Sequence, residues 1–229
     1  MARASLRRRS SCARRGARTA GGRTIVLTRP AGRNERLAAR LRAEGHDVVV
    51  CPLVEIEPIE TGPLELDGYD WLLLTSAAGA EELRERASGR PGKVAAIGRA
   101  TAEAWGEVDL VASVSTQEGL LAELPRPSGR VLFAGAEGAR RLLVDELGAD
   151  FVALYRTTPL VPDEAPVGDL AVVASPSAVR ALAAVAPAMP VVSIGPETSA
   201  AAREAGLILL AEAHEPGVDG LVRAVSEAG

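Results

Sequence analysis

Residues 24–50, TIVLTRPAGRNERLAARLRAEGHDVVV, decide the fold of this chain of 229 residues. They begin with a β-rich apolar run at 24–28, which is typical of a strand covered on both faces. Apolar residues then recur at helical spacing as far as Gly45, and a second β-rich run follows at 47–50. A strand, a helix and a strand in immediate succession predict a βαβ unit, which requires a parallel sheet.

The same succession recurs along the chain, and two of the later copies match each other closely. Residues 70–76 (DWLLLTS) match 169–175 (DLAVVAS), and residues 94–101 (VAAIGRAT) match 191–198 (VVSIGPET). Each match consists of a strand-like run and the start of a predicted helix. Ordered self-similarity of this kind indicates an internal duplication.

The order of the repeated units predicts how the chain connects them. Residues 130–156 parallel 24–51, but they come last in their copy, whereas 24–51 come first in the other copy. The simplest arrangement is two similar α/β domains, the second inserted into the first. We expect a cleft between such domains, the usual location for a small-molecule site.

An inserted domain requires two crossings, and two proline-bounded segments are predicted to form them. Residues 51–58 (CPLVEIEP) alternate apolar and charged side chains, as a half-exposed strand does, and 156–162 (RTTPLVP) are the predicted antiparallel partner. We expect this division of the chain: domain 1 at 23–52 and 163–229, linker strands at 53–62 and 153–162, and domain 2 at 63–152.

The basic residues are concentrated at the N-terminus. Residues 1–22 contain seven arginines and no acid, in a chain with 26 basic and 30 acidic residues. The segment lacks interleaved aromatic residues and precedes an acidic remainder, so we expect no nucleic-acid partner. It also lacks the apolar core of a secretory signal. Residues 1–22 are therefore interpreted as a disordered basic tail, or as a segment upstream of the true start.

The composition excludes several functional classes. With 2 cysteines and 2 histidines, the sequence predicts neither a disulfide framework nor a metal site, and Cys51 is interpreted as a core residue. It contains no glycine-rich phosphate loop. No uninterrupted apolar run reaches the roughly 18 residues of a membrane helix. We therefore expect a cytoplasmic protein without membrane contact.

Small hydroxyl residues and glycines recur where predicted strands pass into helices. Open α/β sheets bind ligands at this carboxyl edge, and the first N–H groups of a helix attract anions. Taken singly, each hydroxyl is better explained by helix capping. Together they favour a ligand with many carboxylates. These turn residues are Thr28, Thr75, Ser76, Gly98, Thr101, Ser175, Pro176, Ser177, Gly195 and Thr198.

With these motifs the chain resembles the uroporphyrinogen-III synthase family over about residues 23–225. The resemblance is carried by an ordered set of short motifs rather than by any one of them. They are LTRP at 27–30, TS at 75–76, IGxxT at 97–101, YRT at 155–157, SPS at 175–177 and IGPxTxA at 194–200.

The resemblance implies an α/β fold of two flavodoxin-like three-layer domains with parallel sheets, the second inserted into the first through a two-stranded antiparallel linker. It also implies a cofactor-free reaction of tetrapyrrole (haem) biosynthesis. In this reaction hydroxymethylbilane loses water and closes with its last pyrrole ring inverted, giving uroporphyrinogen III. The resemblance further suggests a monomer that makes a transient contact with the preceding pathway enzyme.

The resemblance also assigns roles to single residues. Tyr155 is the candidate general acid, and the alternative is an aromatic residue that packs in the linker. Arg29 and the turn residues are the candidates for substrate binding: Thr75, Ser76, Gly98, Thr101, Ser175, Pro176, Ser177, Gly195 and Thr198. No metal ligand is expected. The competing hypothesis is a non-catalytic two-lobed module of the same fold that binds a small anion or serves in regulation.

Overall fold

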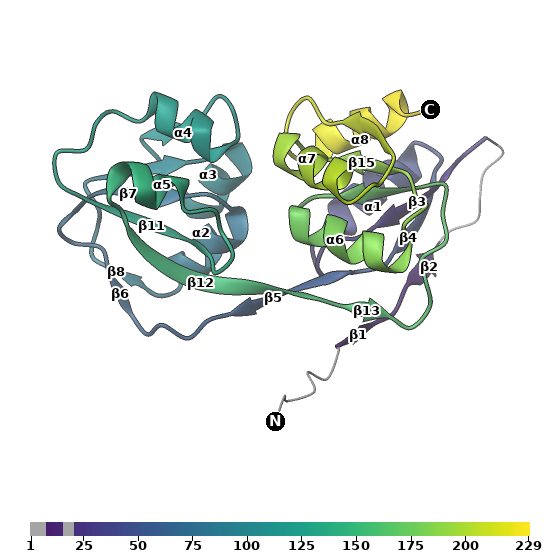
Figure 1. Ribbon diagram of the computed structural model, residues 1–229, viewed down its shortest axis with the longest axis horizontal. Helices are drawn as coiled ribbons and strands as arrows, with labels where there is room; N and C mark the ends of the chain where they lie inside the picture. Colours follow the sequence, from purple (N-terminus) through teal and green to yellow (C-terminus); the bar gives the residue numbers. More distant parts are fainter. Residues whose placement is uncertain (1–7, 16–20) are drawn as a thin grey trace. The chain divides into compact units, whose positions relative to one another are not determined.

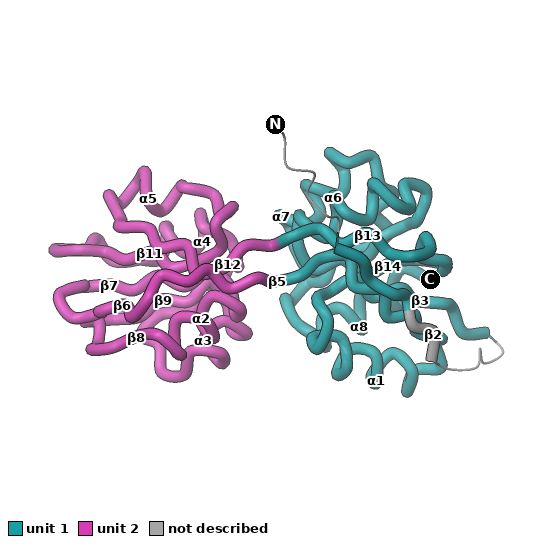
Figure 2. The backbone as a smooth tube through the Cα atoms, turned by 90° about the horizontal axis from the view of Figure 1, so that it is seen from below, with its two compact units in different colours: residues 1–55, 158–229 teal, residues 56–157 magenta. Residues whose placement is uncertain are grey.

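The computed structural model describes residues 8–15 and 21–229. It divides into two compact units, Met1–Glu55 with Thr158–Gly229 (unit 1) and Ile56–Thr157 (unit 2) (Figure 2). Each unit is organised around one six-stranded sheet. The chain therefore leaves unit 1 once and returns to it once.

Unit 1 contains a mainly parallel sheet in the order β16-β15-β14-β3-β4-β2, in which only β2 runs antiparallel to its neighbour. Its strands are β2 (Ala13–Arg15), β3 (Thr24–Leu27), β4 (Asp47–Val50), β14 (Leu170–Val173), β15 (Val191–Ser193) and β16 (Leu209–Glu212). Its helices are α1 (Glu35–Ala43), α6 (Pro176–Val185), α7 (Pro196–Glu204) and α8 (Val218–Glu227).

The strands β3, β14 and β15 of unit 1 are buried on both faces, as continuous apolar runs require. Val26 belongs to the core cluster that includes residues of α6 and α7. Its neighbours Ile25 and Leu27 belong to the cluster on the opposite face, which includes residues of α1 and α8. This alternation gives the three layers visible in Figure 2.

Unit 2 has the corresponding sheet in the order β10-β9-β7-β11-β12-β5, with parallel pairing from β10 to β12. Its strands are β5 (Val54–Pro58), β7 (Tyr69–Leu74), β9 (Lys93–Ala96), β10 (Leu110–Val111), β11 (Arg130–Ala136) and β12 (Asp150–Pro159). Its helices are α2 (Ala77–Arg84), α3 (Arg99–Trp105), α4 (Gln117–Glu123) and α5 (Leu142–Leu147). A short parallel ladder joins β6 (Leu64–Glu65) to β8 (Ala87–Ser88).

The helices of unit 2 also cover both faces of their sheet, with α4 and α5 on one side and α2 and α3 on the other (Figures 1 and 2). Leu73 and Phe133 pack in the core cluster that includes residues of α4 and α5. Leu72 and Leu74 pack in the cluster that includes residues of α2 and α3. The predicted α/β fold with mainly parallel sheets is therefore confirmed.

The two sheets share one strand order, and the sequence repeats occupy equivalent places in it. The central strands β14 and β7 contain the matching runs that end at Ser175 and Ser76, and the next strands outward, β15 and β9, contain the second pair of matching runs. Each of these four strands is followed by a helix. The duplication inferred from the sequence is thus visible in the connectivity.

The segments predicted as linker strands correspond to β5 and to the end of β12, which are neighbours in the sheet. The Ile59 N–H donates to the Leu154 carbonyl in unit 2, and the Leu160 N–H donates to the Leu53 carbonyl in unit 1, both at 2.8 Å. From Leu53 to Ile59 the residue numbers rise along the first segment, whereas those of their partners fall from Leu160 to Leu154. The two segments therefore run antiparallel.

The N-terminal segment differs from the predicted disordered tail wherever the structure describes it; residues 1–7 and 16–20 lie outside the described part. The strand β1 (Arg9–Ser10) pairs in parallel with β13 (Val161–Pro162), and β2 pairs with β4. The physical reason is that β4 would otherwise end the sheet with unpaired backbone groups, which a further strand satisfies.

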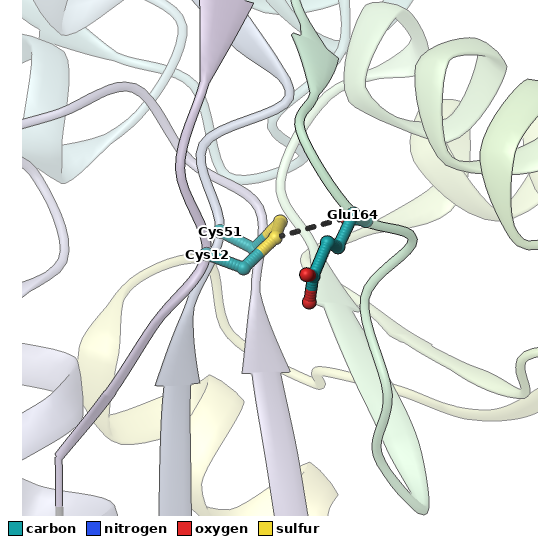
Figure 3. The surroundings of a disulfide bond; sticks show 3 residues. All are labelled: Cys12, Cys51 and Glu164. Carbon is teal, nitrogen blue, oxygen red and sulfur yellow. Dashed lines mark hydrogen bonds between the residues drawn. A yellow bond between two sulfur atoms is a disulfide. The ribbon is translucent and has the colours of Figure 1, made fainter.

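A disulfide joins this segment to the body of unit 1. Cys12 and Cys51 are bonded with their Cα atoms 4.1 Å apart, and Cys51 is fully buried. Cys12 Sγ also lies 3.6 Å from the Glu164 carbonyl oxygen (Figure 3), which is a contact only, since a disulfide sulfur has no proton to donate. Cys51 is therefore a core residue, as predicted, but with a covalent partner that the sequence did not reveal.

Candidate functional site

The predicted site residues of unit 1 gather at the carboxyl edge of its sheet. Arg29 follows β3, Ser175 follows β14 and Gly195 follows β15, and these three parallel strands are adjacent. Pro176 and Thr198 lie in the first turns of α6 and α7, which begin at this edge. The sheet order therefore brings together turns that are far apart in the sequence.

Ser175 is the N-cap of α6 in an extended conformation. Its Oγ accepts from the Ala178 N–H at 3.2 Å and lies 3.0 Å from the Ser177 Oγ. Pro176 occupies the first helical turn, where it costs no hydrogen bond. The Ser175 side chain therefore caps α6 in the structure.

Thr28 and Arg29 end the first strand in different ways. Thr28 is fully buried, and its hydroxyl donates to the Val172 carbonyl at 2.8 Å, so it links two strands. Arg29 is half-buried, and its carbonyl accepts from the Asn34 side-chain amide at 3.0 Å. Burial, followed by the nearby Arg33 charge, lowers the pKa of the Arg29 guanidinium. A cation in such surroundings favours an anionic ligand, which would replace lost solvation.

Unit 2 presents equivalent turns, with an aromatic side chain added. Thr75 and Ser76 follow β7, and Ser76 is the N-cap of α2, accepting from the Gly79 N–H at 3.0 Å. The Tyr155 hydroxyl, on β12, lies 2.9 Å from the same Ser76 Oγ. Tyr155 is only 7% exposed and packs in the core cluster on this face.

Gly79 lies beside both the Ser76 hydroxyl and the Tyr155 ring. A Cβ at Gly79 would lie 3.6 Å from Tyr155 Cε1 and 3.0 Å from the Ser76 Oγ. The same position lies 3.6 Å from the Gly135 Cα of β11. The sequence analysis did not single out either glycine. In the sequence, the spacing of Ser76 and Gly79 is compatible with a helix cap. The position of Gly79 beside Tyr155 is known only from the structure.

Thr101 and Thr198 occupy matching positions three residues after a glycine N-cap. Each residue is 4% exposed. Within the described part of the chain, neither threonine side chain has a hydrogen-bond partner. Neither hydroxyl is among the fully buried, unpaired side-chain polar atoms of the described residues, so each oxygen keeps some access to solvent. These two hydroxyls are therefore available for contact with a ligand.

The glycine N-caps Gly98 and Gly195 both have extended backbones, with φ of 179° and 166°. A Cβ at Gly98 would lie 2.8 Å from the Ser115 Oγ, whereas a Cβ at Gly195 would meet no atom within 4 Å. A Cβ at Gly98 would therefore require the Ser115 hydroxyl to move. At Gly195, the N-cap of α7, there is open space where a side chain would lie.

The described residues contain no group of three or more His, Cys, Asp or Glu side chains placed to hold a metal ion. No helix among them has both the length and the apolar character needed to cross a bilayer. The predicted site residues at the carboxyl edge of each sheet provide hydroxyls, backbone N–H groups and the Arg29 guanidinium. Such a set can bind carboxylates and donate a proton.

The fold and these turns define a duplicated α/β protein whose candidate ligand-binding groups lie at the carboxyl ends of parallel strands. The family model described as "Uroporphyrinogen-III synthase HemD" matches residues 35–223. The chain therefore belongs to the uroporphyrinogen-III synthase family.

Two curated relatives illustrate the similarity. A protein of Synechococcus elongatus named uroporphyrinogen-III synthase is 29% identical over 90% of this chain and 95% of its own length. A Methanocaldococcus jannaschii protein named putative uroporphyrinogen-III synthase is also 29% identical, over 58% of this chain. The chain matches 61% of the length of that relative.

A solved structure supports the fold. The chain resembles a mutant uroporphyrinogen III synthase of the extremely thermophilic bacterium Thermus thermophilus with a TM-score of 0.57. The two sequences are 16% identical, and the match covers 90% of this chain and 98% of the other.

Proposed function

We propose that this chain converts hydroxymethylbilane into uroporphyrinogen III, with inversion of the last pyrrole ring and loss of water. The observation that carries the proposal is the family match over residues 35–223, which includes every predicted site residue except Arg29. The names of the relatives support the same activity. The unpaired Thr101 and Thr198 hydroxyls fit a polycarboxylate substrate.

The substrate carries its own reactivity, so the protein needs to position it and to assist one proton transfer. The C–O bond of the terminal hydroxymethyl group breaks, and its electron pair stays on the oxygen. Tyr155 supplies a proton to that oxygen, and water leaves. The pyrrole nitrogen compensates the electron-deficient methylene carbon, which the substituted carbon of the last ring then attacks.

This attack gives a spirocyclic pyrrolenine. The bond between the attacking carbon and its original methylene then breaks, and that methylene bonds to the free α-carbon of the last ring, so the ring is inverted. The α-carbon loses its proton as the ring regains aromaticity, and this proton returns to the tyrosinate.

Each unit has candidate binding groups at the carboxyl edge of its own sheet. We assign substrate carboxylates to Thr101, Thr198 and the Arg29 cation, together with the N–H groups that begin the neighbouring helices. Holding a flexible chain in a bent conformation accelerates ring closure by lowering its entropy cost. Uncatalysed closure gives the uninverted isomer I, so control of geometry is the essential contribution of the protein.

The finer organisation belongs to the same proposal. It consists of two flavodoxin-like three-layer domains, the first at 23–52 and 163–229 and the second at 63–152, joined by antiparallel linker strands at 53–62 and 153–162. The division into units 1 and 2 and the descending hydrogen-bond partners support this layout. We further propose a cytoplasmic monomer that contacts the preceding pathway enzyme transiently.

The test is an assay with freshly prepared hydroxymethylbilane, followed by oxidation of the products and separation of isomers I and III. We expect isomer III in excess of the enzyme-free control. If only isomer I forms at the uncatalysed rate while the protein still binds hydroxymethylbilane in calorimetry, the non-catalytic binding module is the better description.

A further inference from the structure

The Ser76 hydroxyl is the point where a helix cap meets the candidate catalytic tyrosine. Its Oγ accepts from the Gly79 N–H at 3.0 Å and lies 2.9 Å from the Tyr155 hydroxyl oxygen. The two side chains are 79 residues apart in the sequence. A cap alone needs only the first of these contacts.

The Ser76 hydroxyl can form only a limited number of hydrogen bonds. A serine Oγ has one proton and two acceptor positions. The Gly79 N–H occupies one acceptor position, so the remaining groups are the proton and one lone pair. When Ser76 donates its proton to the Tyr155 oxygen, the phenolic proton of Tyr155 is directed to another acceptor. A hydroxyl with both contacts has little capacity left for a substrate carboxylate.

The packing fixes the direction from which Tyr155 approaches Ser76. The Tyr155 ring edge lies next to Gly79, where a Cβ would be 3.6 Å from Cε1, and Gly79 lies next to Gly135. The backbone of Tyr155 is held as well, because its carbonyl accepts from the Glu137 N–H at 2.8 Å. The short contact to Ser76 is therefore part of a close-packed arrangement.

We propose that Ser76 is a positioning residue for Tyr155 rather than a contact to the substrate. It donates to the phenolic oxygen, which aims the Tyr155 proton at the departing hydroxyl of the substrate. The inference rests on the proposed function, because it assigns Ser76 a part in the same proton transfer.

Ser76 matters most when Tyr155 loses its proton and its oxygen becomes negatively charged. Breaking the C–O bond leaves the electron pair on the departing oxygen, and the Tyr155 proton moves to it to form water. Tyr155 becomes a phenolate, and Ser76 already donates to the oxygen that gains the charge. Hydrogen bonds to charged groups are stronger than those between neutral groups. Ser76 therefore stabilises the product of the proton transfer more than its reactant.

The chain offers a matched control for the capping function. Thr116 is the N-cap of α4 in the same unit, and its side chain accepts from the Gly119 N–H at 3.0 Å, the same distance as in the Ser76 cap. Ser76→Ala and Thr116→Ala each remove a cap, but only Ser76→Ala removes a hydrogen bond to Tyr155. We expect Ser76→Ala to lower kcat about tenfold with little change in KM, as for loss of one hydrogen bond to a charged group. Thr116→Ala leaves kcat within about twofold.

Two further variants separate positioning from a general structural effect. Ser76→Thr keeps the hydroxyl, and we expect it to restore most of the turnover that Ser76→Ala loses. In a Tyr155→Phe background, Ser76→Ala should cause no further loss, because residues that act through one interaction are not additive. Independent losses in the double variant would overturn the proposal.

A spectroscopic measurement reports on the contact without any substrate. The chain has only 2 tyrosines, Tyr69 and Tyr155. Tyrosine labelled with ¹³C at Cζ therefore gives two resonances, which Tyr69→Phe assigns. We expect Ser76→Ala to shift the Tyr155 resonance, and neither Thr116→Ala nor Ser76→Thr to do so to the same extent.

The combined readouts keep this inference distinct from the proposed function. Absence of isomer III from the unmodified protein would defeat the proposed function, whereas the NMR shift would still test the hydrogen bond. An active protein in which Ser76→Ala and Thr116→Ala have the same kcat would overturn the positioning role. An unmoved Tyr155 resonance in Ser76→Ala would do so as well.

Discussion

Ser76 of unit 2 and Ser175 of unit 1 occupy the same place in a duplicated fold, yet they have different partners. Each follows the central matching strand with an extended backbone, at φ −159° and −165° respectively. Each accepts a hydrogen bond from the N–H three residues later. The remaining contact is the Tyr155 hydroxyl for Ser76 and the Ser177 hydroxyl for Ser175. Duplication therefore preserved the cap, and one phenol distinguishes the two copies chemically.

A second pair of equivalent turns shows what the duplication kept unchanged. The helices α4 and α8 begin with the similar sequences QEGL and VDGL. Glu118 of α4 pairs with Arg140, and Asp219 of α8 pairs with Arg40. The sequence analysis did not recognise this match. Gly119 and Gly220 each lie so close to a backbone carbonyl, that of Val114 and that of Glu215 respectively, that a larger residue would not fit in either turn.

The largest effect is expected from adding one methyl group at Gly220. A Cβ there would overlap the backbone carbonyl oxygen of Glu215, just as a Cβ at Gly119 would overlap that of Val114. Backbone atoms cannot rotate away, so Gly220→Ala should destabilise the protein by about 3 kcal/mol despite the better helix propensity of alanine. Urea unfolding measures the loss. Gly138→Ala is the control, because a Cβ at Gly138 meets no atom within 4 Å.

The next effect concerns the phenol that only unit 2 provides. Tyr155→Phe keeps the ring and removes the proton donor, so we expect kcat for isomer III to fall on the order of 10²-fold, at the low end for general acids. Circular dichroism and urea unfolding should show an intact fold. A rate equal to that of the unmodified protein would exclude Tyr155 from the reaction and leave it as a packing residue.

A smaller effect compares the two caps directly. Ser76→Ala and Ser175→Ala each remove one helix cap, so each should lower the free energy of unfolding by about 1 kcal/mol. The two losses are expected to be equal within error in thermal or urea unfolding. A much larger loss for Ser76→Ala would mean that its contact with Tyr155 serves stability as well as chemistry.

The smallest effect is expected at the Glu118–Arg140 pair. The hydrogen bonds from Arg140, at 2.5 and 2.9 Å, lower the pKa of Glu118 to about 2. A depressed pKa adds stability above the ordinary value near 4.5, and this is lost as the pH falls towards 2. Both side chains are about half exposed, so solvent screening limits the gain to about 0.5 kcal/mol at neutral pH.

The measurement is urea unfolding of Glu118→Gln at pH 7 and pH 3. We expect the variant to be slightly less stable at pH 7 and the difference to shrink at pH 3. Glu85→Gln, at an exposed carboxylate without an ion pair in the described part of the chain, serves as the control and should show no such trend.

The strands and helices were largely predictable because their signals are local. The runs at 24–28 and 70–76 are continuous and apolar, and the caps Ser76 and Ser175 stand at the expected turns. The repeat supplied the connectivity as well, because matching strands must occupy matching positions in two similar sheets. The fold class therefore followed from patterns within short windows.

The unpredicted features depend on contacts between distant segments. Cys12 bonds to a residue 39 positions later, and the pairing of β2 with β4 depends on a free sheet edge that no short window reveals. The partnership of Ser76 with Tyr155 is of the same kind. In the sequence, a hydroxyl at a turn looks the same whether its partner is a ligand or a side chain, so the contact of Ser76 with Tyr155 could not be predicted.

The interrupted layout of unit 1 has a consequence for biosynthesis. Its strand β3 pairs on one side with β14, which the ribosome delivers only after the whole of unit 2. The central part of that sheet therefore stays incomplete until all the segments of unit 2 have emerged. The helix α8, which supplies Leu221 and Val225 to the core, arrives later than β14. Nascent chains stalled before residue 170 should accordingly lack a protease-resistant unit 1.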